Sequence, residues 1–467
     1  MAQAEAVPSR HEVELKRQIG LYAATAITVG NIIGSGIFRS PHSVAQHLTG
    51  FWLVLVAWVI GGILSICGSL ALAELAVTHP KTGGLYVFIR EGFGDGWAFV
   101  FGWANLWVIK PTVIASITSV FALYFCNSIG ITAFSGATEV EKARVAMAQF
   151  EVGSAAILLL TFINWLGVKQ GAGTQSLFTT AKVVGILGLC VAAFTLRSSH
   201  GAGPMEALPT AQSHSLLSAF ALAMISILFA YDGWTDSTYV AGEILEPKRT
   251  LPIAIVWGTW LVIAVYLLTK IAYFHVLGAD GVARYPAVGS ETIRRLLGDW
   301  GARALAVLVA VSTFGTINGA ILTGPRVTQA MAADGLLWRP LAALHPRRGT
   351  PALALWVQAV LSCVWLWCAN GFEDVSGWFV TTSWLFYALT TASLFVQRRR
   401  ERSDRIAAHE YRTPLYPLPA WLFIVATALI IGSDLHDSGW KAWAGVGIAA
   451  LGFPVYLFWK GRGGRRA

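Results

Sequence analysis

The stretch GNIIGSGIF, residues 30–38, interrupts the first long apolar segment of the chain, which runs over about residues 19–39. A membrane-spanning helix is expected there, but three glycines and a serine weaken it, since each interior glycine costs about 1 kcal/mol relative to alanine. Backbone that leaves the helix within hydrocarbon is tolerated only where it is buried in protein or lines a cavity. The spacing of Gly30 and Gly34 also fits close packing of two helices. On this stretch alone, both interpretations stay open.

The composition predicts a helical membrane protein. Of the 467 residues, 55% are hydrophobic and only 13% are charged, whereas soluble domains carry about 25% charged residues. Twenty tryptophans suit a protein with two membrane–water interfaces. The five cysteines show neither disulfide nor zinc spacing and are interpreted as packing residues, so we expect no metal and no cofactor. About eighteen polar residues precede the first apolar segment, which we expect to be an uncleaved anchor.

Twelve segments are apolar enough to cross a bilayer, for which about 20 residues are needed. They are residues 19–39, 51–77, 97–126, 150–168, 174–197, 214–242, 252–277, 301–331, 351–369, 373–397, 417–432 and 440–460. From these segments we predict a tail (1–18), two five-helix repeats (19–200 and 201–400), and a C-terminal part (401–467) with a basic loop and two more helices.

Lysine and arginine residues gather in alternate loops. The loops on the side of the N-terminus carry more than twice as many as the loops on the other side. Cytoplasmic loops are the positively charged ones, so both termini are expected in the cytoplasm of a protein of the cell inner (plasma) membrane. This distribution accounts for the net charge of +9 without a nucleic-acid partner. The basic run 398–405 is expected to contact the headgroups of the lipid bilayer.

A second interruption, FAYDGW at residues 229–234, lies in the sixth apolar segment. Each interruption falls about 15–18 residues into the first helix of its half of the chain. Broken helices at matching positions in two halves indicate a secondary transporter whose site lies between inverted repeats. The pair of interruptions therefore favours a transporter over simple helix packing.

Two broken helices suit a zwitterionic amino acid. The start of a half-helix presents N–H groups to a carboxylate, and the end of a half-helix presents carbonyls to an ammonium group. The expected donors are at Ser35, Gly36 and Ile37, and the expected carbonyls belong to residue 32 and to residues 229–232. The predicted substrate-binding residues at the two breaks are Ile32, Gly34, Ser35, Gly36, Ile37, Phe229, Ala230, Asp232, Gly233 and Trp234.

Longer stretches resemble a known family. GNIIGSGIF (30–38), FAYDGWTDSTYVAGEILEPKRTLPIAI (229–255) and STFGTINGAILTGPR (312–326) resemble the L-type amino acid transporters of the amino acid–polyamine–organocation (APC) superfamily, as do HPKTGGLYVFIREGFG (79–94), SWLFYALT (383–390) and RTPLYPLPA (412–420). The resemblance implies an all-α, LeuT-like fold of about 12 helices, with a five-plus-five inverted repeat, unwound helices 1 and 6, and alternating-access transport of amino acids.

The resemblance also bears on partners. Family members that need a single-span glycoprotein carry a cysteine in the outer loop between helices three and four. That loop, about residues 127–149, has none here. We therefore expect a prokaryotic-type transporter without a covalent glycoprotein heavy chain.

Lys182 lies in the middle of the fifth apolar segment, where an unpaired charge is costly. In the family a lysine on this helix occupies the place of the sodium ion of sodium-coupled relatives and ties the fifth helix to the first and eighth. The resemblance thus gives Lys182 a coupling role, with Ser312 and Thr313 as eighth-helix contacts, and implies sodium-independent exchange. The alternative is that Lys182 releases its proton during the cycle, which would give proton symport.

For several other polar and aromatic residues, a role at the substrate site and a structural role both stay open. Asp232 either caps the following half-helix or borders the substrate. Phe229 is a gate over the substrate by resemblance, or a packing aromatic. Thr112 and Asn318 are expected at the pocket, although many such side chains only join helices. Residues expected near helix ends, and therefore interfacial, are Lys270, His275 and Arg326; Lys110 has no assigned role.

Other functions are disfavoured. An enzyme would need a nucleophile–base or metal constellation, and the ten histidines are scattered. A primary pump would need GxxxxGK[ST], which does not occur. A channel or a receptor would need a filter or a sizeable ligand domain, and neither is visible. The sequence thus predicts a sodium-independent exchanger of neutral, and secondarily cationic, L-amino acids, with a proton symporter and a polyamine or organocation transporter as alternatives.

Overall fold

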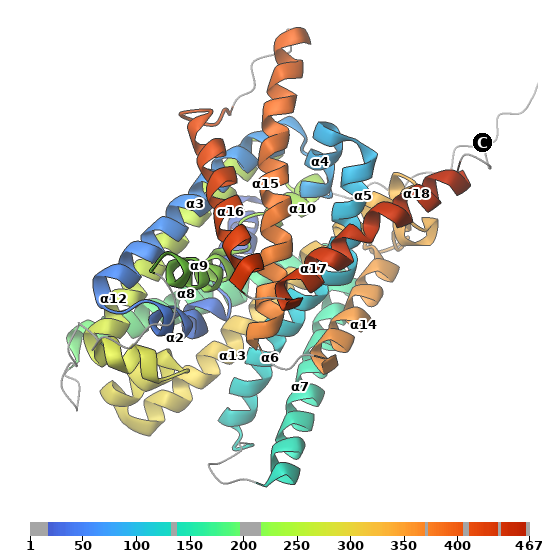
Figure 1. Cartoon of the computed structure of the whole chain (residues 1–467). Helices are drawn as coiled ribbons and strands as arrows, with labels where there is room; N and C mark the ends of the chain where they lie inside the picture. Colours follow the sequence, from blue (N-terminus) through green and yellow to red (C-terminus); the bar gives the residue numbers. More distant parts are fainter. Residues whose placement is uncertain are drawn as a thin grey trace, which may run out of the picture.

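The structure, a computed structural model, describes residues 17–131, 138–196, 216–368, 372–404, 411–437 and 440–463. Within these ranges the chain is a bundle of helices (Figure 1), and the only β pairing is an isolated bridge between Ile19 and Ile244. Most of the predicted N-terminal tail and the chain between residues 196 and 216 lie outside the described residues.

The described part of the first half of the chain contains eight α-helices. They are α1 (Leu21–Ile32), α2 (Gly36–His47), α3 (Phe51–Thr78), α4 (Leu85–Phe93), α5 (Asp95–Ala104), α6 (Lys110–Ser128), α7 (Glu139–Leu166) and α8 (Val168–Thr195). A π-helical turn, Asn105–Ile109, joins α5 to α6 into one span.

The second half of the chain is also helical in its described part. Its helices are α9 (Leu216–Tyr231), α10 (Asp236–Tyr239), α11 (Pro247–Pro252), α12 (Gly258–Arg284), α13 (Val288–Ala333), α14 (Ala352–Cys368), α15 (Phe372–Asp404), α16 (Leu418–Asp437), α17 (Trp440–Ala450) and α18 (Gly452–Gly463). A second π-helical turn, Ile253–Trp257, joins α11 to α12, and short 3-10 helices occupy Ala241–Glu243 and Arg339–Ala342.

The predicted segments are mostly helical where the structure describes them, and the first and sixth are interrupted by non-helical residues. Ten helical stretches are long and apolar enough to cross a membrane, and α9 and α14 are shorter apolar helices. The boundaries differ clearly at the eighth segment, whose helix begins at Val288 and not at residue 301, and at the fourth segment. The fourth segment begins at Glu139 and not at residue 150. Its first turns are polar, so hydropathy does not mark them, but Thr138 and Glu141 form a capping box that starts the helix there.

The two broken helices run antiparallel. The backbone N–H groups of Gln18 and Ile19 donate to the carbonyl of Glu243 at 2.8 and 2.9 Å, and Leu245 N–H donates to the carbonyl of Ile19 at 2.8 Å. The second broken helix therefore ends where the first begins. We call this side of the membrane the N-terminal side.

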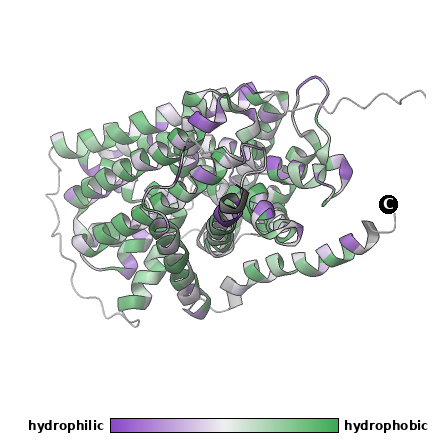
Figure 2. Cartoon of the chain, turned by 90° about the horizontal axis from the view of Figure 1, so that it is seen from above, coloured by the Kyte–Doolittle hydropathy of each residue, from purple (hydrophilic) through white to green (hydrophobic). Residues whose placement is uncertain are grey.

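The centre and the surface of the bundle differ in packing. The long helix α13 packs against α6 and α8, while α2 packs against α9 and α12. Helices α7 and α8 expose large apolar side chains along their length, as expected for contact with lipid, and Figure 2 shows apolar residues over the helices at the edge of the bundle. The exposed apolar side chains on these two helices include Leu158, Leu159, Phe162, Val184 and Val191.

The cysteines are all free thiols. Cys67, Cys126 and Cys190 are buried, in agreement with a packing role, and Cys363 is partly buried. Cys368 is exposed, so the packing interpretation is wrong for this residue.

Arg326 is not an interfacial residue, contrary to the expectation from sequence. It belongs to α13, is fully buried, and its Nε lies 2.9 Å from Oε1 of the equally buried Glu243. Glu243 is also the residue whose carbonyl receives the N–H groups of Gln18 and Ile19. The ion pair therefore fixes the N-terminal-side ends of both broken helices to α13.

Replacing Arg326 tests this anchor. Arg326→Gln leaves the Glu243 carboxylate buried without its cation, and breaking a buried pair in this way costs about 3–5 kcal/mol. We expect a lower midpoint of thermal unfolding for the purified protein. Arg249→Gln is the matched control, because Arg249 pairs with Glu246 at 3.9 Å and both side chains are more than three-quarters exposed. Equal midpoints for the two variants would contradict the anchoring role.

Candidate functional site

The first break separates α1 from α2. Helix α1 ends at Ile32, residues 33–35 are not helical, and α2 begins at Gly36. Ser35 occupies the N-cap position of α2 without a side-chain cap hydrogen bond, and its buried hydroxyl has no partner among the described residues. The first N–H groups of α2 thus point into the break without a capping side chain from Ser35.

The second break separates α9 from α10. Helix α9 ends at Tyr231 and α10 is a single turn, Asp236–Tyr239, followed by the 3-10 turn Ala241–Glu243. Gly233 lies in the break with a φ of 117°, a conformation that side chains other than glycine rarely adopt. The predicted interruption is confirmed, although the half-helix after it is shorter and less regular than the one after the first break.

The two breaks touch each other. A Cβ atom on Gly36 would lie 2.6 Å from Cα of Ala230, and a Cβ atom on Gly233 would lie 2.7 Å from the backbone of Asn31 and Ile32. Each break therefore packs its glycine against the residues that precede the other break. This close approach uses backbone alone.

A small space lies at the breaks, with a volume of about 20 Å³. This is room for about one water molecule, so the described conformation is nearly closed. Six of the predicted residues line it, namely Ile32, Gly34, Ser35, Gly36, Phe229 and Asp232; the other lining residues are Asn31, Val113, Ile117 and Thr316. We call this space the candidate cavity.

Phe229 separates two spaces. It lines the candidate cavity and also a larger pocket of about 250 Å³ on the side opposite the N-terminal side. That pocket contains both charges and hydroxyl groups, from residues that include Arg39, Ser40, Ser43, His47, Ser226 and Asp434. Phe229 is 7% exposed and its ring packs edge-on against Phe379, with centroids 6.0 Å apart. Phe229 therefore lies between the two spaces.

Asp232 contacts the wall of the cavity and a neighbouring helix. Tyr387 of α15 donates its hydroxyl hydrogen bond to Oδ1 of Asp232 at 2.7 Å. The N-cap position of α10 is occupied by Thr235, which makes no side-chain cap. Asp232 thus lies at the candidate cavity, as the substrate-border interpretation requires.

Several predicted residues do not line the candidate cavity. Trp234 packs between Tyr387 and Phe423, with ring centroids 5.4 and 5.9 Å away. Thr112 donates to the carbonyl of Val108 in its own helix, and the next residue, Val113, faces the cavity instead. Ile37, Ala230 and Gly233 lie at the breaks but not in the cavity wall.

Asn318 belongs to a polar network behind the cavity, not to its wall. Its Nδ2 donates to the carbonyl of Gly171 at 3.1 Å and to Oε1 of Gln175 at 3.2 Å. Asn164 donates to its Oδ1 at 2.8 Å. These contacts join α13 to α7 and α8, which is the helix-joining role that the sequence left open for such residues.

Lys182 of α8 is fully buried against the first break. Its Nζ lies 2.9 Å from the carbonyl of Gly30, 2.7 Å from that of Ile33 and 2.7 Å from Oγ1 of Thr316. The ammonium therefore joins the fifth segment to the first and the eighth. The eighth-segment contact is Thr316, which also lines the cavity, and not Ser312 or Thr313.

The two residues that the sequence proposed as contacts of Lys182 do not bond to it. Thr313 donates to the carbonyl of Val309 in its own helix at 2.7 Å, and the buried hydroxyl of Ser312 has no partner among the described residues. All three hydroxyl residues lie within five positions of one another on α13, and the rotation of that helix decides which one meets Lys182.

Two residues of α12 contact the breaks without having been predicted. The hydroxyl oxygen of Tyr266 lies 2.8 Å from the carbonyl of Ile32 and 2.9 Å from that of Ala230, so it bridges the last turns before the two breaks. Lys270, expected to be interfacial, is buried, and its Nζ donates to the carbonyl of Ile37 at 3.0 Å. Neither residue carries a motif that marks it in an apolar helix.

Comparison with known proteins gives consistent matches. The family model described as amino acid permease matches residues 19–451. The serine/threonine exchanger SteT of Bacillus subtilis (strain 168) is 31% identical over 452 residues, 96% of this chain and 98% of that protein. The b(0,+)-type amino acid transporter 1 of Mus musculus is 31% identical over 93% of this chain and 87% of its own, and the Asc-type amino acid transporter 1 of the same species is 31% identical over 96% and 83%.

Two antiparallel broken helices around one small cavity define a secondary transporter with a LeuT-like, five-plus-five inverted-repeat fold. The chain belongs to the amino acid permease family and, within the APC superfamily, to the L-type amino acid transporters. It is a multi-pass membrane protein that transports amino acids, and the resemblance seen in its sequence is confirmed.

Gly36 provides a test of the candidate site. In Gly36→Val the new Cβ meets the backbone of Ala230, so α2 must move away from α9 and the candidate cavity loses its shape. We expect loss of amino acid binding while yield and monodispersity of the purified protein are kept. Gly188→Val is the matched control, since nothing lies within 4 Å of a Cβ at Gly188. Wild-type affinity in purified Gly36→Val protein would place the substrate elsewhere.

Proposed function

We propose that this protein is a sodium-independent exchanger of neutral L-amino acids, with cationic L-amino acids as a second substrate class, working by alternating access. The observation that carries the proposal is the ammonium of Lys182, held by two carbonyls of the first break and by Thr316. We further propose both termini in the cytoplasm, because the positive loops lie on the N-terminal side.

The ammonium of Lys182 occupies a position that suits a monovalent cation. Carbonyl and hydroxyl oxygens are ligands that a sodium ion would use, and Lys182 supplies the same positive charge as a permanent part of α8. A side chain cannot leave with the substrate and draw on an ion gradient. Return of the empty carrier is then unfavourable, and a second amino acid drives the return step.

The proposed binding of the substrate backbone uses both breaks. The first N–H groups of α2, at Gly36 and Ile37, suit the carboxylate, and the hydroxyl of Ser35 adds a donor. The carbonyls of Ile32 and Ala230 suit the ammonium group. Both lie within hydrogen-bonding distance of the Tyr266 hydroxyl, which has a single hydrogen to donate, and each carbonyl oxygen has two lone pairs, so each is able to accept from the substrate.

The side-chain specificity is proposed to depend on Asp232 and Phe229. Asp232 lines the candidate cavity and brings a carboxylate to it, which suits small polar and cationic side chains. Phe229 closes the cavity toward the larger pocket as the proposed gate. The names of the relatives cover serine and threonine as well as large neutral amino acids, so neutral substrates come first in this proposal.

The chain is proposed to work in the cell inner membrane without a covalently attached heavy chain. One relative carries the name large neutral amino acids transporter small subunit 2, and it comes from Mus musculus. In the present chain, residues 127–149 contain no cysteine, and Cys126 is buried, so that region offers no exposed thiol to a partner.

Proton symport is the second candidate. The observation that favours it is the burial of Lys182 without a carboxylate among its described hydrogen-bond partners, which makes the charged form costly. A polyamine transporter is a third candidate, which carboxylate recognition by the start of α2 argues against. Decarboxylated amines should then compete poorly with amino acids.

Uptake into proteoliposomes tests the exchange proposal. We expect uptake of labelled neutral amino acid into vesicles loaded with unlabelled amino acid, and little into empty vesicles. Replacing sodium with potassium or choline should leave this uptake unchanged. Lys182→Ala should slow exchange at least about tenfold, equivalent to about 1.4 kcal/mol in the barrier.

Two outcomes would contradict the proposal in different ways. Uptake into empty vesicles driven by an imposed sodium gradient would show that Lys182 does not replace a coupling sodium ion. Uptake into empty vesicles driven by a proton gradient would leave Lys182 central but replace exchange with proton symport.

Asp232→Asn tests the proposed specificity. If the carboxylate contacts cationic side chains, its loss should raise the KM of L-lysine about tenfold, since a hydrogen bond to a charged group is worth about 1.5–3 kcal/mol. The KM of a neutral amino acid should change little. Tyr387→Phe is the control, because it removes the hydrogen bond to Asp232 but keeps the charge. Equal losses for both substrate classes would assign Asp232 a structural role only.

A further inference from the structure

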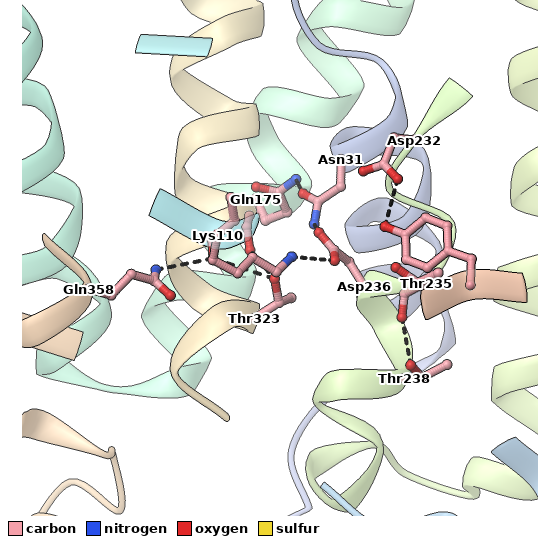
Figure 3. A network of polar contacts seen from close by, with 12 residues as sticks. Asn31, Lys110, Gln175, Asp232, Thr235, Asp236, Thr238, Thr323 and Gln358 are labelled. Carbon is pink, nitrogen blue, oxygen red and sulfur yellow. Dashed lines mark hydrogen bonds and ion pairs between the residues drawn. The ribbon is translucent and has the colours of Figure 1, made fainter. Parts of the chain in front are cut away.

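The carboxylate of Asp236 joins three helices on the N-terminal side of the candidate cavity. Asp236 is the first residue of α10 and is 5% exposed. Lys110 Nζ, from α6, lies 2.6 Å from Oδ1, and Asn31 Nδ2, from α1, lies 2.5 Å from Oδ2 (Figure 3). Both carboxylate oxygens are therefore used, one by each of two other helices.

We propose that the Lys110–Asp236 ion pair is a latch that holds the candidate cavity closed toward the N-terminal side, and that Asn31 joins this latch to the cavity wall. The proposal rests on the proposed alternating-access function and names the contact that one of its two states must break. Lys110, to which the sequence gave no role, thereby becomes a positioning residue.

The position of the latch follows from the direction of the second broken helix. Phe229 precedes the second break and borders the larger pocket on the opposite side. Asp236 follows the break on the segment that leads to Glu243, the residue that receives the start of the first broken helix. The candidate cavity thus lies between an aromatic side chain on one side and a buried ion pair on the other.

Opening toward the N-terminal side must disturb these bonds. If α1 separates from α10, the bond between Asn31 and Asp236 breaks, and if α10 separates from α6, the ion pair breaks. In each case the Asp236 carboxylate loses a donor while it is buried. A carboxylate removed from water in this way is costly until water reaches it, which favours the closed arrangement.

The local backbone holds Lys110 in place. It directly follows the π-helical turn Asn105–Ile109 and precedes Pro111, which has no N–H group. A π-helical turn contains an extra residue, which changes the face that the next residues present, and such turns are frequent at functional sites. Lys110 Nζ also lies 4.8 Å from the ring centre of Tyr239, one turn after Asp236.

Asn31 links the latch to the site because it is the member of this group that lines the candidate cavity. Its Oδ1 accepts from Nε2 of Gln175 at 3.1 Å, so both ends of the amide are hydrogen-bonded. Gly319 of α13 faces this amide and has no side chain to displace it. A substrate group beside Asn31 therefore acts directly on a donor of Asp236.

A cysteine reporter on α10 tests the latch without any amino acid present. Ser237 is fully buried, and its hydroxyl has no partner among the described residues, so Ser237→Cys is a mild change. The five native cysteines are replaced in the full-length protein. The labelling rate of Cys at position 237 by a maleimide then reports how often the region around α10 opens.

We expect Asp236→Asn and Lys110→Met each to raise the labelling rate by about tenfold, because each leaves a buried charge or amide without its partner in the closed state. Lys270→Met is the matched control: Lys270 is also a buried lysine, but its Nζ contacts Ile37 on α2, beyond the other end of the first break. It should leave the labelling rate within about twofold of the parent, which is about 0.4 kcal/mol.

Two results would overturn the latch. One is an unchanged rate in Asp236→Asn and Lys110→Met; the other is an equal rise in Lys270→Met, which would mean general loosening. If a single variant does not fold, the double variant Lys110→Met/Asp236→Leu removes both charges and leaves none unpaired. It should fold and should also label faster. Since no substrate is needed, the test can fail while the proposed exchange function stands, and the reverse is equally possible.

Discussion

The close approach of two interrupted helices is the constraint on which this structure depends. Gly36 packs on Ala230, and Gly233 packs on the backbone of Asn31 and Ile32. Since no side chain fits where the breaks meet, backbone of both breaks lies at the candidate cavity beside side chains of the surrounding helices. Backbone N–H and carbonyl groups suit the carboxylate and ammonium groups that every amino acid carries. Discrimination between amino acids is then left to the side chains that line the cavity.

An interrupted helix in hydrocarbon leaves carbonyls that need donors, because an unsatisfied backbone group there costs several kcal/mol. Here side chains from α8 and α12 supply them. Lys182 donates to the carbonyls of Gly30 and Ile33, and the hydroxyl of Tyr266 reaches the carbonyl of Ile32. The same donors that make the unwound backbone tolerable also tie it to helices that are unbroken there. The same hydrogen bonds therefore stabilise the unwound backbone and couple its movement to α8 and α12.

The sequence predicts the spans and both breaks, because apolar runs and the glycines that interrupt them are local signals. The attachment of Lys182 to the first helix is predicted only through the resemblance to the L-type transporters. The sequence does not predict which hydroxyl meets Lys182. Ser312, Thr313 and Thr316 all carry hydroxyls within a little more than one turn, and successive residues of a helix point about 100° apart, so the rotation set by packing selects Thr316. Helix rotation also explains why the prediction for Thr112 is wrong: the next residue, Val113, lines the cavity instead.

The two proposed closures of the candidate cavity differ in chemistry, and this difference bears on the mechanism. Phe229 is a single aromatic side chain, and moving it exposes apolar surface to the larger pocket without separating charges. The Lys110–Asp236 pair opens only when charges part within a low-dielectric interior. Entry past Phe229 therefore needs a side-chain movement, whereas opening on the other side needs helices to move and water to enter. A carrier built in this way exposes its charged closure only when another interaction compensates the loss. In the proposed binding mode the polar backbone groups of the amino acid would reach the cavity beside Asn31, where such compensation would begin.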